Sequence, residues 1–375
     1  MKYTSIFFVG LLVILGCSNA QTSDKEPRLT ISGKVENPQQ QGVITLNEIQ
    51  RSSVVPVDTI ELNSDNTYSF KFYGEPGFYQ LNFYGIQAVT VILENSNLTV
   101  NVDGSDPRGF YEVSGSMEID QIKKYNADQA AEFGAKEQEL NDKYVAAKQA
   151  GDEASASAVQ QEYMDLLKDK EKLTIATIKE VGPNLVSFQL LSGLDKDRNV
   201  DFIDSMAQIL NKKYPDKFFI QDLVDQMQIA KKTAVGKVAP EIALPTPEGN
   251  ILKLSSLRGQ VVLVDFWAQW CKPCRMENPN VVAAYKKYHD KGFTVYGVSL
   301  DRTKEKWVQA IEEDGLTWNQ VSDLKYFNSE AAREYGVDAI PFSILLDRNG
   351  VVVAKNLRGA ALDKELDKLF AAEGK

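Results

Sequence analysis

Histidine is almost absent from this sequence: His289 is the only one in 375 residues. Structural zinc sites take four ligands, most of them cysteine or histidine side chains. The whole chain holds three cysteines, so ligands of this kind are too few to predict a zinc site. We therefore expect neither a metal site nor a metal cofactor.

Long runs of lysine and arginine are also missing. The chain has 42 basic against 52 acidic residues, a net charge of −10. This balance argues against nucleic-acid binding and against an electrostatic membrane patch. A hydrophobic fraction of 43% is typical of a globular protein with an ample core, and the length predicts about two or three domains.

The N-terminus carries the one conspicuous apolar run. Lys2 precedes Ile6 to Leu15, a stretch too short to span a bilayer and typical of a signal peptide. Its end, Ile14-Leu15-Gly16-Cys17, resembles the bacterial lipobox, whose cysteine is lipid-modified. We expect residues 1–16 to be a lipoprotein signal peptide, Cys17 the lipidation site and residues 17–28 a tether. The alternative is an ordinary secretory signal with a chance cysteine.

Three patterns follow along the chain. Residues 29–114 alternate in short period-two runs between turn residues, which predicts an antiparallel β-sandwich. Residues 115–233 are rich in Ala, Gln, Glu, Lys and Leu and predict a helical segment. Residues 234–375 alternate strand and helix patterns, which predicts a compact α/β domain. The expected helices of the middle segment are 117–149, 153–181, 184–192, 199–212 and 216–232.

The stretch from Val261 to Cys274 is the chemical centre of the last segment. A buried-looking β-run, Val261 to Phe266, leads to Cys271-Lys272-Pro273-Cys274 at the start of a helix. Two thiols three positions apart can close a disulfide within one turn or leave it open, and a helix N-terminus favours the reactive thiolate. If Cys17 is acylated, these are the only thiols left. The pair therefore predicts a thiol–disulfide exchange centre.

The residues around the pair suggest how the work is divided. We expect Cys271, at the exposed helix start, to attack, and the more buried Cys274 to resolve the mixed disulfide. Lys272 adds a positive charge that lowers the pKa of Cys271, and Pro273 is tolerated in the first helical turn. Asp265, in an apolar strand, is a candidate base for the Cys274 proton. A satisfied polar strand residue is the alternative for Asp265.

Residues Asp265 to Cys274 closely resemble the thioredoxin active-site signature. The motifs Gly236-Lys237-x-Ala239-Pro240, Cys274-Arg275-Met276-Glu277-Asn278-Pro279 and Gly297-Val298-Ser299-Leu300-Asp301 resemble exported, tethered thioredoxin-like proteins of the TlpA/ResA type, an AhpC/TSA-Redoxin-like module. The resemblance is strong over 234–375. Over 29–232 it is architectural only, to the domain that precedes such modules in lipoproteins of Bacteroidetes-type bacteria. It implies a C-terminal thioredoxin fold with no cofactor beyond the Cys271–Cys274 disulfide.

The same resemblance implies roles for further residues. Glu277 matches an acid that tunes the thiol pKa values, although a surface salt-bridge partner is the alternative. Ile340-Pro341 matches a cis-proline that packs beside the cysteines, where the neighbouring backbone pairs with the substrate. Trp270 is expected on the apolar rim for a docked peptide, and Gly359 is expected to leave room for that peptide's backbone. A proline before the second cysteine implies a reductant.

The leading hypothesis is an exported, lipid-anchored thiol–disulfide oxidoreductase that reduces oxidised proteins, apocytochromes c among the candidates. A membrane thiol carrier would supply the electrons, and the place would be the periplasmic side of the cell envelope, with the outer membrane favoured. One alternative is a thiol peroxidase of peroxiredoxin type, because that class shares the 236–240 motif, although Val264 and Ala268 replace its proline and threonine. Another is a ligand- or partner-binding lipoprotein whose functional part is 29–232.

Overall fold

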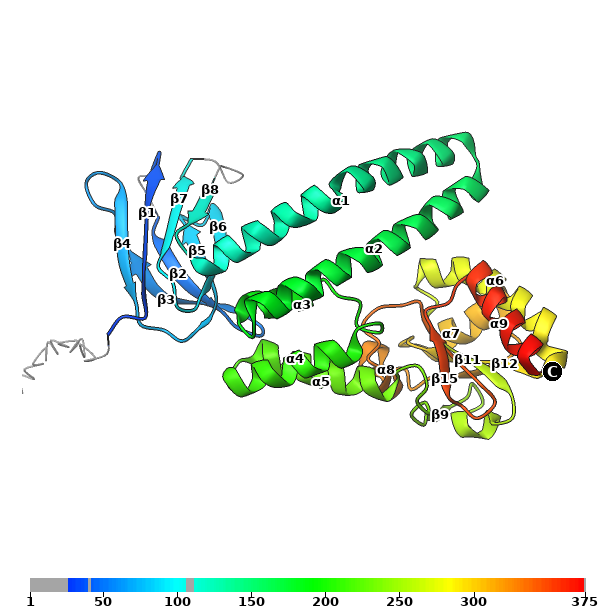
Figure 1. Ribbon diagram of the computed structural model, residues 1–375. Helices are drawn as coiled ribbons and strands as arrows, with labels where there is room; N and C mark the ends of the chain where they lie inside the picture. The colour runs from blue at the N-terminus through cyan, green and yellow to red at the C-terminus, as the bar shows by residue number, and fades with distance from the viewer. Residues whose placement is uncertain (1–25, 40–41, 106–110, 374–375) are drawn as a thin grey trace, which may run out of the picture. The chain divides into compact units, whose positions relative to one another are not determined.

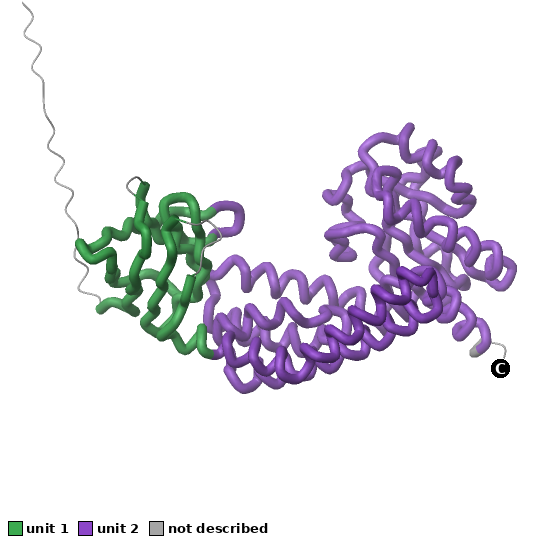
Figure 2. The backbone as a smooth tube through the Cα atoms, turned by 90° about the horizontal axis from the view of Figure 1, so that it is seen from above, with its two compact units in different colours: residues 1–49, 54–120 green, residues 50–53, 121–375 purple. Residues whose placement is uncertain are grey.

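The computed structural model describes residues 26–39, 42–105 and 111–373 (Figure 1). They form two compact units (Figure 2): one holds Val54–Asp120 and the described residues up to Ile49, and the other holds Gln50–Ser53 and the described residues from Gln121 onward. The predicted signal peptide and Cys17 lie outside the described residues. Within the described ranges, no helix is both long and apolar enough to cross a membrane.

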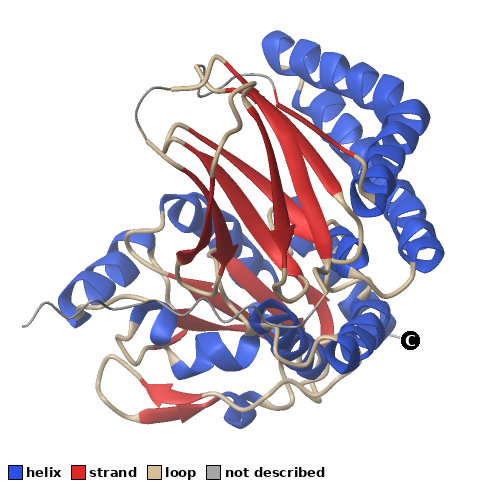
Figure 3. Ribbon diagram, turned by 90° about the vertical axis from the view of Figure 1, so that its left-hand side faces the viewer, coloured by secondary structure: helices blue, strands red, loops and turns tan. Residues whose placement is uncertain are grey.

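The first unit is a β-sandwich, as predicted (Figure 3). Its two four-stranded sheets have the orders β4-β1-β7-β8 and β3-β2-β5-β6, and every neighbouring pair is antiparallel except β1 with β7. Both sheets turn alternate residues, such as Ile31 and Leu81, into one core. The described strands are β1 (Leu29–Glu36), β2 (Ile44–Ile49), β3 (Val54–Ile60), β4 (Thr67–Phe72), β5 (Gly77–Phe83), β6 (Gln87–Leu93), β7 (Leu98–Asp103) and β8 (Tyr111–Ser114).

The helical middle segment follows the predicted bounds within two residues at each end. Gly151, with φ 69°, turns the chain between the first two helices, and the Asp152 side chain caps the second by accepting from the amide of Ser155. Phe133 and Val159 pack in the core between these two helices. The helices are α1 (Met117–Ala150), α2 (Glu153–Val181), α3 (Leu185–Leu191), α4 (Val200–Lys213) and α5 (Phe218–Lys232).

The C-terminal part of the second unit is the α/β domain that the sequence predicted, with a five-stranded sheet in the order β13-β12-β11-β14-β15. The pairs β11–β12 and β12–β13 are parallel, whereas β14 and β15 are antiparallel to their neighbours. The elements are β9 (Ala243–Pro245), β10 (Ile251–Lys253), β11 (Val261–Trp267), α6 (Lys272–Tyr288), β12 (Phe293–Ser299), α7 (Lys304–Asp314), β13 (Asn319–Val321), α8 (Glu330–Tyr335), β14 (Phe342–Leu346), β15 (Val352–Lys355) and α9 (Ala360–Glu373). Residues Leu254–Leu257 form a 3-10 turn after β10.

Strand β11 lies in the middle of this sheet. All seven of its residues are buried, because it is flanked by β12 and β14 and is covered on both faces. Its Val-Val-Leu-Val run suits such a position, since β-branched and aliphatic side chains pack well on a pleated surface. The strand therefore forms a rigid base at whose C-terminal end the cysteine pair stands.

Candidate active site

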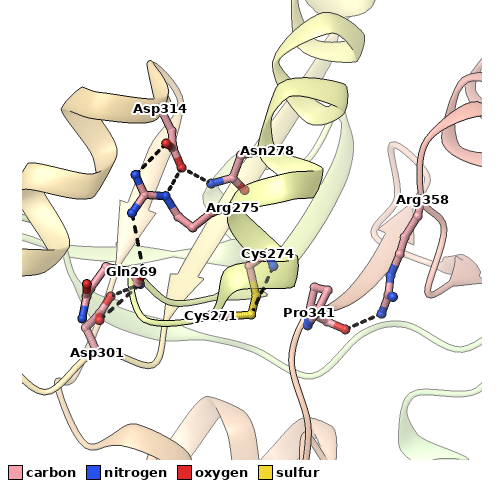
Figure 4. The surroundings of a disulfide bond; sticks show 9 residues. All are labelled: Gln269, Cys271, Cys274, Arg275, Asn278, Asp301, Asp314, Pro341 and Arg358. Atoms are coloured by element: carbon pink, nitrogen blue, oxygen red, sulfur yellow. Dashed lines mark hydrogen bonds and ion pairs between the residues drawn. A yellow bond between two sulfur atoms is a disulfide. The ribbon is translucent and has the colours of Figure 1, made fainter.

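The cysteine pair lies at the turn from β11 into α6 (Figure 4). Cys271 is the N-cap residue of α6, and its Sγ accepts from the backbone amide of Cys274 at 3.2 Å. The two cysteines are joined by a disulfide with their Cα atoms 5.3 Å apart. Pro273 stands in the first turn of the helix, where its missing N–H leaves no hydrogen bond unmade. Lys272 is exposed beside it.

Both cysteines are buried in this oxidised state. Cys271 is 4% exposed and Cys274 is 1% exposed, and both belong to the same apolar cluster as the residues of β11. The prediction that Cys274 is the more buried of the two is confirmed. The prediction that Cys271 lies exposed is wrong, because the helix start packs against the core rather than projecting from it. Charges near the pair consequently act through a medium of low polarity.

Asp265 is the buried acid of β11. Its register partners are Gly297 in β12 and Ser343 in β14, and its side chain is 8% exposed. Loss of hydration, reinforced by the Glu277 carboxylate and opposed by the Arg358 guanidinium, raises the pKa of Asp265 to about 7. A carboxyl group that titrates near neutrality can both accept and return a proton.

Glu277 lies half-buried on α6, one turn beyond Cys274. One of its carboxylate oxygens accepts from the backbone N–H of Gly359 at 2.7 Å, and the other accepts from the Asn280 side chain at 3.0 Å. Glu277 therefore joins α6 to the segment that leads into α9. Gly359 has a φ of 49°, a left-handed conformation that glycine adopts without strain.

The peptide bond Ile340-Pro341 is cis, as the resemblance implied. Pro341 lies beside the disulfide in Figure 4, and its carbonyl oxygen accepts from a guanidinium nitrogen of Arg358 at 2.7 Å. Trp270, the residue before Cys271, is 41% exposed. Of the site residues predicted from the sequence, Pro341 therefore lies beside the disulfide, and Glu277 and Gly359 are hydrogen-bonded to each other.

Asp301 and Arg275, two residues for which the sequence predicted no role, hold the loop before Cys271 in place. The backbone N–H of Gln269 donates to both carboxylate oxygens of Asp301, at 3.1 and 3.3 Å, and the Ser299 hydroxyl donates to the same carboxylate. The carbonyl oxygen of Gln269 accepts from Arg275 at 3.5 Å (Figure 4). Asp301 is 1% exposed, and burial raises its pKa. Its position just after β12 is the signal that was available, because parallel strands β11 and β12 end at the same edge of the sheet.

Arg275 should also contribute to stability. Its guanidinium pairs with Asp314 at 2.7 Å and with Glu313 at 2.9 Å, and its side chain is 25% exposed. We expect Arg275→Ala to lower the free energy of unfolding by about 1–3 kcal/mol, because it leaves a partly buried carboxylate with fewer partners. Urea unfolding followed by tryptophan fluorescence checks this, since all four tryptophans lie between residues 267 and 318. The exposed Arg333→Ala is the control, expected within about 0.5 kcal/mol of wild type; equal losses in both variants would contradict the prediction.

Disulfide exchange is the chemistry that this geometry allows. A dithiol within one helical turn can attack an external disulfide and then expel the product by closing its own. The described residues hold no group of three or more His, Cys, Asp or Glu side chains placed to bind a metal ion. The C-terminal domain is accordingly that of a thioredoxin-fold thiol–disulfide oxidoreductase.

Comparison with known proteins defines the family. Residues 235–355 match the AhpC/TSA family, and residues 29–122 match a domain of unknown function (DUF4369). Over 123 residues the chain is 32% identical to the thiol-disulfide oxidoreductase ResA of Bacillus thuringiensis (strain Al Hakam), covering 33% of this chain and 69% of that protein. ResA of Geobacillus thermodenitrificans is 34% identical over 119 residues, or 32% of this chain and 67% of that protein. The chain belongs to the family of ResA-like thiol–disulfide oxidoreductases.

A solved structure is similar to the same region. The thioredoxin domain of a thiol-disulfide oxidoreductase from Bacteroides vulgatus is 44% identical, with a TM-score of 0.35; the match covers 36% of this chain and 96% of that chain.

Proposed function

We propose that this protein is an exported, lipid-anchored reductase of protein disulfides. The observation that carries the proposal is the closed Cys271–Cys274 pair at the start of α6, in the same domain core as the buried acid Asp265. Disulfide exchange itself follows from the family; the direction, the anchor and the partners are the proposed part.

The charges around the pair favour the reducing direction. Oxidants of this fold are those whose reduced form is stabilised, for example by a strongly lowered thiol pKa. Here only a helix N-terminus and the exposed Lys272 favour the Cys271 thiolate. Asp265 lies in β11 and Glu277 lies on α6, the strand and helix that flank the cysteine pair. The negative charge of these carboxylates opposes formation of a thiolate. The reduced form is therefore stabilised only modestly, so the dithiol is expected to act as a reductant.

The proposed reaction has two steps. The Cys271 thiolate attacks one sulfur of the substrate disulfide, an S–S bond forms between them, and the second substrate sulfur leaves as a thiolate that takes up a proton. The Cys274 thiol then gives its proton to Asp265 and attacks the Cys271 sulfur. This re-forms the enzyme disulfide and releases the first substrate sulfur, the one bonded to Cys271, as a thiolate that takes up a proton. Two electrons pass to the substrate, so a membrane thiol carrier must return two electrons before the next cycle.

The remaining candidate residues are assigned to tuning and docking. Pro273 fixes the helix start, Glu277 adjusts the charge near the thiols, and Trp270 and the Ile340-Pro341 backbone receive the substrate chain. Gly359 is better assigned to holding Glu277, because its N–H already donates to that carboxylate.

The cellular setting of the proposal rests on the N-terminal sequence. A lipid on Cys17, exposed after removal of residues 1–16, would hold the protein at the cell envelope through the tether 17–28, facing the periplasm and favouring the outer membrane. In the sequence, the sandwich at 29–114 and the helices at 115–233 stand between the proposed lipidation site and the redox domain 234–375. Oxidised proteins are the substrates, with apocytochromes c as one candidate.

A thiol peroxidase is the second candidate function, because the matched family is AhpC/TSA. Two observations weigh against it. Val264 and Ala268 occupy the positions of the peroxiredoxin proline and threonine. Both are completely buried, Val264 within β11 and Ala268 directly after it, and neither presents a polar group. A peroxidatic centre needs donors that bind the peroxide oxygens, and apolar side chains supply none.

Trapping of the mixed disulfide tests the proposal. A Cys274→Ser variant lacks the resolving thiol, so we expect it to remain covalently joined to its substrates through Cys271 and to be released by dithiothreitol. Non-reducing gels of the purified envelope fraction, followed by mass spectrometry of the captured partner, give the measurement. The Cys271→Ser/Cys274→Ser double variant is the matched control and should capture nothing. Wild-type protein that turns over peroxide faster than it reduces insulin disulfides would instead support the peroxidase.

A further inference from the structure

A cavity of about 440 Å³ lies beside the cysteine pair, on the side of Trp270. It lies where the loop before α6 meets the loop that joins β12 to α7. No role in the proposed reaction has been assigned to it. Its walls are formed by Gln269, Trp270, Asp301, Arg302, Thr303, Lys306 and Tyr326.

Aromatic rings form one wall of this cavity. The Trp270 ring lies 5.0 Å from the ring of Tyr326 and 6.2 Å from that of Phe327, measured between centroids. Tyr326 has a φ of 58° and so does Leu324, a conformation that non-glycine residues adopt only where the surroundings hold them there. The Ser322 hydroxyl anchors this segment by donating to the carbonyl oxygen of Ser299 at 2.8 Å. The aromatic wall is therefore a fixed feature rather than a loose loop.

Two cations stand at the same cavity. The Arg302 guanidinium carbon lies 4.3 Å from the centroid of the Tyr326 ring, which orients its charged plane, and Lys306 lies one turn into α7. Within the described ranges, neither side chain forms a salt bridge. The one acid in the lining, Asp301, is 1% exposed, and its carboxylate oxygens accept hydrogen bonds from the Gln269 N–H and the Ser299 hydroxyl. The cavity thus carries a net positive charge on a chain whose overall charge is −10.

We propose that this cavity is a subsite for an acidic side chain of the protein substrate, located next to the cysteine that forms the mixed disulfide. The proposal deepens the disulfide-reductase function and rests on it. The chemistry that fits is a carboxylate, because a guanidinium offers two parallel N–H donors to its oxygens and an ammonium adds a second charge. The faces of Trp270 and Tyr326 cover the apolar part of an aspartate or glutamate residue and its backbone. The chain has a net negative charge, which repels an acidic segment. The cations of this cavity would therefore determine where such a segment docks.

The test compares two disulfide-bonded peptides that differ only in charge. One carries glutamates beside its cysteines and the other carries lysines at the same positions. For the wild-type protein we expect kcat/KM for the glutamate peptide to exceed that for the lysine peptide by about five- to tenfold at low salt. The ratio should approach one as the ionic strength rises, because salt screens exposed charges. In Arg302→Glu/Lys306→Glu the ratio should invert.

A matched control separates the cavity from overall charge. Lys286→Glu/Lys364→Glu makes the same change in net charge at two exposed positions outside the cavity and should keep the wild-type ratio. If the charge reversal at the cavity impairs folding, the neutral Arg302→Gln/Lys306→Gln should bring the ratio close to one. A ratio that is the same in wild type and in both cavity variants would overturn the proposed subsite. Failure of the wild-type protein to reduce either peptide would contradict the reductase function itself.

Discussion

Replacing Cys271 by alanine is expected to lower insulin-disulfide reduction by about a thousandfold or more, because the variant loses the atom that attacks the substrate. Cys274 cannot take over that role. It is 1% exposed, and it lies one turn inside α6, away from the N-cap position where a thiolate is stabilised. The measurement is the rate of insulin precipitation with dithiothreitol as electron donor.

The control for this loss is a substitution elsewhere on the same domain. Ile251→Ala, at a position in β10 that is 62% exposed, should keep the wild-type rate within about twofold. A Cys271→Ala protein that retains half of its activity would refute the assignment of Cys271 as nucleophile. If the purified variant is inactive but cells that carry it behave normally, the functional part of the protein is 29–232 rather than the redox pair.

Short-range pattern was sufficient to predict most of the elements that support this site. The apolar run of β11, the proline in the first turn of α6 and the left-handed glycine between α1 and α2 are local signals, and each element formed where it was expected. Strand β3 runs along a sheet edge, is largely exposed and contains Pro56, so it lacks the buried alternation by which a strand is predicted from sequence. Exposure weakens the pattern from which a strand is recognised.

Contacts between distant residues were beyond that reasoning. Asp301 meets Gln269 across 32 positions, and Glu277 meets Gly359 across 82. Neither pairing has a periodicity or spacing that marks it, because each depends on how β12 and α9 close against α6. The burial of Cys271 has the same origin: a helix start is exposed by default, and only the completed domain covers it. The identity of the redox pair was therefore predictable, but its immediate supports were not.

For Asp265, the sequence pattern and the structure both indicate a buried carboxyl group. A lone carboxylate in a run of valine, leucine and phenylalanine had to be desolvated, and its pKa is raised to about 7 in the folded protein. Its ordinary value of 3.8 applies in the unfolded chain. At a pH between these two pKa values, Asp265 is protonated in the folded protein but ionised in the unfolded chain. Stability is therefore highest below about pH 4 as far as this group is concerned, and is lost as the pH rises towards 7.

Replacing Asp265 by asparagine should remove that loss. One pKa unit is worth about 1.4 kcal/mol, so the variant is expected to be more stable than wild type by up to about 4 kcal/mol at pH 8, with the difference shrinking towards zero near pH 4. Urea unfolding of the oxidised proteins across pH 4 to 8, followed by tryptophan fluorescence, measures the difference. Asp338→Asn, at an exposed position, is the control and should show no pH-dependent gain. A gain for Asp265→Asn that does not change with pH would show that Asp265 is not the titrating group.

The same substitution should slow the reaction. Asparagine cannot accept the Cys274 proton, so resolution of the mixed disulfide is expected to fall by about 10²-fold at pH 7, a typical contribution of a positioned base. Rapid-quench measurement of the mixed disulfide with a peptide substrate should show it accumulating in Asp265→Asn but not in Asp338→Asn. A variant that is both more stable and slower identifies the buried carboxylate as a group kept for chemistry at the expense of stability. Unchanged resolution together with the stability gain would instead support the alternative that Asp265 is only a polar residue of the strand, and the proton of Cys274 would then pass directly to water.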